Sequence, residues 1–84
     1  MERKYCIIVI QNESDGILYG YMPDFTLSAS ESSAEDIVMT LTQLAQTYID
    51  LANKHGQQIP FPTSLDKMQE KWSGFTVSQI SVQV

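Results

Sequence analysis

The sequence predicts one α+β domain in the order β-β-β-α-(short α)-β, with a single mixed sheet and a long helix packed on one of its faces. A β-branched run over residues 4–11 is typical of a central strand. Apolar residues spaced three and four apart after Ala34 predict a long amphipathic helix. The length of 84 residues leaves room for one core, so we assign residues 1–84 to a single domain.

The first two strands are expected to form a hairpin. Residues 4–11 carry apolar side chains on both alternating sets, which favours burial on both faces. Asp15-Gly16 suits a tight turn at the end of the polar stretch 11–16, and residues 17–22 then follow as the second strand. Pro23 removes a ladder donor and should end that strand. Weak alternation over residues 25–30 predicts a short third strand.

The long helix is predicted to begin at Ala34, because Ser33 and Asp36 have the spacing of a capping box. Gly56 supplies a left-handed residue and ends the helix. We expect its broad apolar face to be centred on Leu44, with Gln46 on the polar side. That face comprises Ile37, Val38, Leu41, Leu44, Ala45, Tyr48, Ile49, Leu51 and Ala52.

The C-terminal third is predicted to hold a connector, a short helix and the last strand. Ile59-Pro60-Phe61-Pro62 is extended, because each proline disfavours helix in the residue before it. Ser64 can cap a helix over residues 65–71. Residues 75–84 change their apolar alternation, so we expect a strand with a bulge near Ser78-Gln79. We expect this strand to lie parallel beside the first, after a right-handed crossover.

The first strand needs cover on both faces, and one long helix covers only one of them. The second face therefore requires the short helix, a second copy or a partner, and we favour a second copy. A chain of this size also buries little surface by itself. We therefore expect a homo-oligomer, either a dimer or a tetramer.

The charges are unevenly distributed along the chain. There are ten acidic residues and five basic ones, and no Lys or Arg lies between Tyr5 and Asn53. Phosphate backbones require clustered cations, so we expect no direct nucleic-acid binding and favour a basic protein partner. The other reading is an acidic surface that only keeps the domain soluble. The apolar run after Lys4 is too short for an export signal or a membrane span, which predicts a cytoplasmic protein with no membrane association.

The reactive residue types do not form a catalytic or metal-binding pattern. Cys6 is the single cysteine and His55 the single histidine, so neither a disulfide nor a zinc ligand set is available. The carboxylates of the first half fit turns and the first turn of the helix. The four glycines are scattered and form no phosphate loop. We expect no catalytic residue, no metal, no cofactor and no enzyme activity.

Four residues are candidates for contact with a partner or a second copy: Tyr19, Tyr21, Asp24 and Phe25. Tyr19 and Tyr21 share one sheet face, where aromatic side chains serve equally as core residues or interface anchors. For Pro23-Asp24-Phe25, a structural role competes with partner contact. In that structural role Asp24 caps the turn and Phe25 packs under the helix.

Three features together resemble the HicB antitoxin family over nearly the whole chain. They are residues 15–25, the Ser-rich capped helix, and Gly56 followed by Ile59-Pro60-Phe61-Pro62. The resemblance implies a HicB-like, partly ribonuclease H-like fold. Thr26-Leu27-Ser28 stands where the family usually has Pro-Gly-Cys. Many HicB proteins continue after the fourth strand into a DNA-binding domain, so we expect the HicB-like N-terminal domain only.

The resemblance implies an antitoxin that binds and masks a small basic HicA-like mRNA endonuclease. Such a protein acts by occlusion and not by catalysis, and complementary charge would speed its association with the toxin. The alternative is an orphan HicB-like homo-oligomer with a regulatory or scaffold role and no toxin partner. The two hypotheses differ in whether a basic toxin binds.

Overall fold

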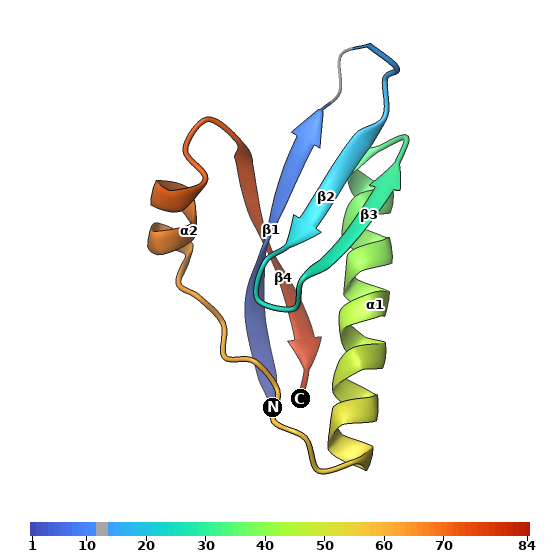
Figure 1. Cartoon of the computed structure of the whole chain (residues 1–84), viewed down its shortest axis with the longest axis vertical. Helices are drawn as coiled ribbons and strands as arrows, with labels where there is room; N and C mark the ends of the chain where they lie inside the picture. The colour runs from blue at the N-terminus through green and yellow to red at the C-terminus, as the bar shows by residue number, and fades with distance from the viewer. Residues whose placement is uncertain (12–13) are drawn as a thin grey trace.

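The computed structural model describes residues 1–11 and 14–84. Asn12 and Glu13, in the predicted hairpin turn, lie outside the described residues. The elements are β1 (Glu2–Gln11), β2 (Leu18–Met22), β3 (Leu27–Glu31), α1 (Ala34–Lys54), α2 (Leu65–Lys71) and β4 (Thr76–Gln83). The strands of this part of the chain form one sheet in the order β3-β2-β1-β4 (Figure 1). The predicted α+β class and the order of elements are confirmed.

The predicted mixed sheet with a parallel last strand is wrong, because every strand pair is antiparallel. The cause is the return path between β3 and β4. Helix α1 carries the chain along the sheet in one direction, and the connector with α2 carries it back (Figure 1). Strand β4 therefore starts beside Val9 and ends beside Glu2.

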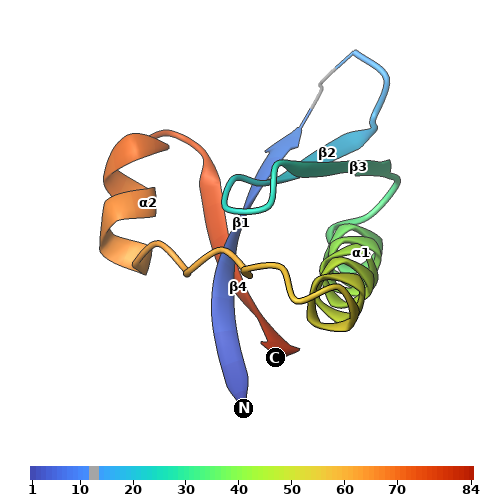
Figure 2. The ribbon, with the colours of Figure 1, turned by 60° about the horizontal axis from the view of Figure 1, so that its bottom comes forward.

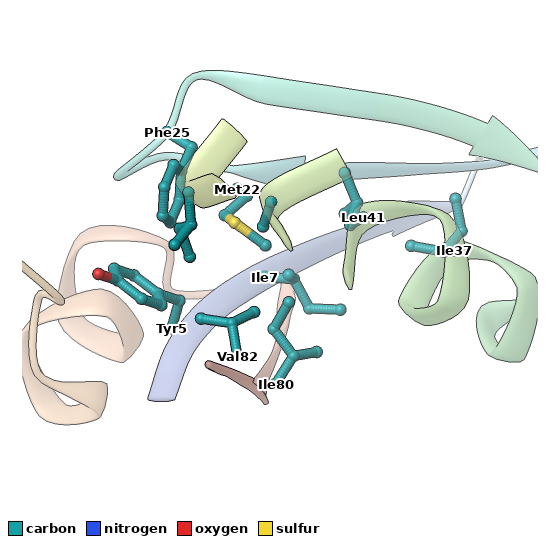
Figure 3. Packing of buried hydrophobic residues seen from close by; sticks show 10 residues of the cluster. Tyr5, Ile7, Met22, Phe25, Ile37, Leu41, Ile80 and Val82 are labelled. Atoms are coloured by element: carbon teal, nitrogen blue, oxygen red, sulfur yellow. The ribbon is translucent and has the colours of Figure 1, made fainter. Parts of the chain in front are cut away.

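The predicted bulge in the last strand is also wrong. The register of β4 against β1 continues without interruption from the Thr76–Val9 pair to the Gln83–Glu2 pair. Ile80 and Val82 point into the core under α1, as Figure 3 shows. Val77 points to the opposite face of the sheet, which is covered separately. The apolar alternation therefore changes along β4 because both faces of the strand are covered, and no extra residue is inserted.

The third strand exists but is shifted along the chain, to Leu27–Glu31 in place of the expected residues 25–30. Phe25 and Thr26 belong to a tight turn, in which their amides donate to the carbonyls of Met22 and Pro23. Thr26 has a φ of 52°, which places it in the left-handed region and outside a strand. The turn therefore uses the residues that were expected to begin the strand.

Helix α1 begins and ends as predicted. The Ser33 hydroxyl accepts a hydrogen bond from the amide of Asp36 at 3.1 Å, which satisfies one of the free N–H groups of the first turn. At the other end Gly56 has a φ of 67°, a conformation that favours glycine. Ser64 caps α2 in the same way, through the amide of Lys67.

The predicted centre of the buried helix face is wrong. The residues of α1 that are buried are Ile37, Leu41, Ala45, Ile49 and Ala52. The first four join residues of β1, β2 and β4 in the core shown in Figure 3. Leu44 is 40% exposed and lies beside this stripe. Gln46, expected to face solvent, exchanges two hydrogen bonds with the main chain of Gln83 in β4.

The second face of β1 is covered in part by this chain itself. Cys6 and Ile8 point away from α1 and are fully buried. On this side lie α2 and the connector of residues 57–64 (Figure 2), and the Cys6 thiol contacts the Thr63 carbonyl at 3.9 Å. Of the three expected coverings, the short helix and connector thus cover this part of the face.

Candidate functional site

The face of the sheet that points away from α1 is open over β2 and β3. Tyr19 and Tyr21 project from this face, as their alternation predicts, and their neighbours across the ladder are Ile10 and Ile8 of β1. Tyr19 is 41% exposed and Tyr21 is half-buried. The sequence-predicted pair therefore lies together at a surface.

A hollow of about 400 Å³ lies over this open face. Its lining combines Ile10, Tyr19 and Tyr21 with small residues of β3, mainly Ser28 and Ser30. Serine side chains cover little of the sheet, which leaves Tyr19 exposed beside them. Such a surface offers aromatic anchors for a partner and hydroxyl groups that can form hydrogen bonds with it.

The end of α2 adds two more aromatic rings to this surface. The Trp72 ring meets Tyr21 edge-on with 5.8 Å between ring centroids, and Phe75 follows at 6.0 Å from Trp72. Phe75 is 47% exposed and lines a second hollow together with Ile10. We call Ile10, Tyr19, Tyr21, Trp72 and Phe75 the aromatic patch.

Trp72 carries a feature that is unusual inside a protein. Its indole N–H is buried and has no hydrogen-bond partner among the described residues. Buried donors without a partner are rare in native structures because each one costs free energy. This donor lies at the border of the aromatic patch, between Tyr21 and Phe75.

The charges divide the molecule into two regions. Three of the five residues of the aromatic patch come from β1 and β2, within the stretch from Tyr5 to Asn53 that has no basic residue. The basic residues are Arg3, Lys4, Lys54, Lys67 and Lys71, which lie at the start of β1, the end of α1 and on α2. The β1 and β2 part of the open sheet face therefore comes from the stretch without basic residues, whereas Trp72 directly follows Lys71 of α2.

Asp24 and Phe25 lie apart from the aromatic patch, in the turn between β2 and β3. The Asp24 carboxylate accepts hydrogen bonds from the Thr63 amide at 2.8 Å and the Thr63 hydroxyl at 2.7 Å. Phe25 is 5% exposed and packs edge-on between the rings of Tyr5 and Tyr48. Their contacts hold the connector and the helix to the sheet, and a contact of either residue with a partner stays a prediction.

Removing the Asp24 carboxylate is expected to destabilise the domain. Asp24→Ala deletes both acceptors of Thr63, and hydrogen bonds to charged groups contribute about 1.5–3 kcal/mol each. We expect a loss of about 2–4 kcal/mol in the free energy of unfolding, measured by urea denaturation. Thr63→Val keeps the amide and loses only the hydroxyl, so it should cost clearly less. Equal costs would contradict this account of the turn.

The structure also locates the remaining reactive groups. Burial raises the pKa of the Cys6 thiol, the negative charge of Asp24 raises it further, and a hydrogen bond with Gln79 acts in the opposite direction. No three His, Cys, Asp or Glu residues gather closely enough to hold a metal ion in residues 1–11 and 14–84. In the same residues, neither helix combines the length and apolar character needed to cross a membrane.

Sequence reasoning missed Trp72 and Phe75 as members of the surface. They are 51 and more residues beyond Tyr21 along the chain, and their contact depends on where α2 returns to the sheet. The signal available in the sequence was their type, since Trp and Phe are enriched in interface cores. The pattern of one strand could identify Tyr19 and Tyr21 but not their aromatic neighbours.

The sequence matches no family model and no curated protein. Among solved structures, the fold is similar to the N-terminal domain of the antitoxin HicB from Burkholderia pseudomallei. The TM-score is 0.82 at 13% sequence identity, over 98% of this chain and 100% of that chain. This chain has the fold of the HicB N-terminal domain. The likeness to HicB covers every helix and strand described above, while the ribonuclease H-like character of the fold stays a prediction.

Proposed function

We propose that this chain is a HicB-like antitoxin that binds and masks a small basic HicA-like mRNA endonuclease toxin. The observation that carries the proposal is an open aromatic sheet face on an acidic chain with a HicB-like fold. Tyr and Trp are the residues that most often dominate binding energy. The net charge of the chain, ten acidic residues against five basic ones, favours a basic partner.

The proposed mechanism is occlusion. An antitoxin of this kind covers the toxin surface that would hold RNA, together with the toxin's active histidine, and performs no chemistry. The acidic charge raises the rate of encounter with a basic toxin, and the aromatic anchors slow dissociation. Neither step requires a catalytic residue, a metal or a cofactor on this chain.

The test is capture of the partner from the native host with tagged protein. We expect a stoichiometric small basic protein, identified by mass spectrometry, whose RNA cleavage is inhibited by one equivalent of this chain. Tyr19→Ala should weaken its binding about 30-fold, the effect of losing one aromatic hot spot of about 2 kcal/mol. Raised salt should slow association, because it screens the surface charges.

A matched control separates loss of the surface from loss of the fold. Met39→Ala also removes a large exposed side chain, but from the side of α1 that faces solvent, so binding should be unchanged. Both variants should melt at the temperature of the wild type. Recovery of the chain alone, without any basic protein, would overturn the proposal and favour the orphan homo-oligomer.

A further inference from the structure

Strand β3 has an open edge. It is the outer strand of the sheet and pairs with β2 only, within the part of the chain that the structure describes. Along each antiparallel pair, residues that exchange hydrogen bonds with the neighbouring strand alternate with residues whose N–H and C=O point the other way. Starting from the Val84–Met1 hydrogen bond, this alternation can be followed through the registers of all four strands. It leaves the main-chain N–H and C=O groups of Ser28 and Ser30 pointing outward. An exposed edge of this kind is a template for another strand.

The opposite edge of the sheet is closed at its end. The Gln46 side chain donates to the Gln83 carbonyl at 2.7 Å and accepts from the Gln83 amide at 3.0 Å. The amide group thus imitates a neighbouring strand at the outward-pointing groups of β4. A further strand therefore cannot pair at this end of β4. Pairing through β3 alone stops at two copies, whereas pairing at both edges would permit open-ended growth.

An uncharged apolar surface lies along α1 beside the open edge. Leu44, Tyr48 and Leu51 are at least 40% exposed and share one side of the helix. That side faces β3, because the Thr40 hydroxyl donates to the Glu31 carboxylate at 3.0 Å and the Tyr48 ring meets Phe25. We call Leu44, Tyr48 and Leu51 the α1 flank.

We propose that a second copy of this chain docks on the β3 edge and the α1 flank, related by a two-fold axis through Ala29. Antiparallel pairing about this axis places Ser28 of one copy opposite Ser30 of the other, so their outward groups satisfy each other. The strands would be about 4.8 Å apart. Because α1 contacts β3, this axis brings the two α1 helices side by side, and packed helices usually lie about 8–10 Å apart.

The charges of α1 also favour a second copy over other occupants. The two-fold axis makes the helices antiparallel, so the acidic first turn of each, with Glu35 and Asp36, lies at the same end as Lys54 of the other. The dipoles of two antiparallel helices also attract each other. The flank itself carries no charge that would be buried on association. The β3 edge and the α1 flank contain no residue of the aromatic patch, although Ser28 and Ser30 also line the hollow beside it, and the inference does not rest on the proposed toxin.

Molecular mass measured by light scattering and sedimentation tests the proposal. Wild type should be a dimer at roughly 100 µM and dissociate on dilution, as expected of a contact made by one short strand edge and one helix flank. Ser30→Pro removes an outward N–H, which edge strands tolerate, and should raise the dissociation constant more than tenfold. A monomeric wild type at this concentration overturns the proposal.

Charge variants identify the partner as a second copy. Leu44→Asp and Leu44→Lys should each be monomeric, whereas a mixture of the two should form a heterodimer, because opposite charges then face each other. Met39→Asp, on the solvent side of the same helix, should remain dimeric. Folding of each variant is checked by its melting curve. Folded Ser30→Pro and Leu44→Asp proteins that remain dimers would overturn the proposed surface.

Discussion

A Leu41→Asp variant is expected to be unfolded at room temperature. Leu41 has no exposed surface and lies in the middle of the buried stripe of α1. The substitution loses the packing of a core leucine, about 2–5 kcal/mol, and adds an unpaired buried charge, which costs several more. Native domains have only about 5–15 kcal/mol of stability in total. Far-ultraviolet circular dichroism should show loss of the helix signal and of cooperative melting.

The matched control for this variant is Leu44→Asp. Leu44 is one helical turn away and carries the same side chain, but 40% of its surface is exposed. A charge there remains hydrated, so we expect a folded protein that has lost no more than about 1 kcal/mol. Melting should stay cooperative. The same behaviour in both variants would mean that α1 is rotated about its axis relative to the core.

The helix shows how far sequence periodicity reaches. Its bounds followed from Ser33, Asp36 and Gly56, because capping depends on neighbouring residues. Its buried centre did not, because the apolar face spans roughly 160° at about 100° per residue. A sheet covers only part of so broad a face. Ile37, Leu41 and Ala45 are covered, and the part left uncovered became the α1 flank.

The sheet shows a limit of a different kind. The positions of β1, β2 and β4 followed closely from local residue types, whereas β3 is shifted along the chain. The direction of β4 depends on the path of the connector. That path is fixed by contacts between distant residues: the Thr63–Asp24 hydrogen bonds, the Tyr5 hydroxyl donating to the Pro60 carbonyl, and Arg3 over the Phe61 ring. The sequence predicted an extended connector. It could not show that the connector and α2 carry the chain back to the end of the sheet where α1 begins.

The sequence predicted one half of the candidate site. Tyr19 and Tyr21 are two residues apart in one strand, so their common face followed from alternation alone. Trp72 and Phe75 join them because of where α2 ends. Local spacing therefore identified the strand half of the aromatic patch, and the tertiary path of the chain supplied the other half.

A Gly20→Ala variant is expected to lose about 1–3 kcal/mol of stability, the usual cost of overpacking a core. A Cβ atom at this position would clash with Ile37 Cγ2 and lie 3.0 Å from Leu41 Cδ1. Gly20 has no positive φ, so the cost comes from contact with α1 and not from backbone strain. Chemical denaturation of both proteins measures the difference.

The source of this cost can be isolated with a double-mutant cycle. Ile37→Ala removes Cγ2, so adding Gly20→Ala in that background should cost at least 1 kcal/mol less than in the wild type. Equal costs in the two backgrounds would show that Ile37 is not the obstacle. Gly20 also lies between Tyr19 and Tyr21 in β2. A clash that moves β2 away from α1 shifts both tyrosines, so Gly20→Ala should weaken binding of the proposed basic partner and Ile37→Ala should restore it.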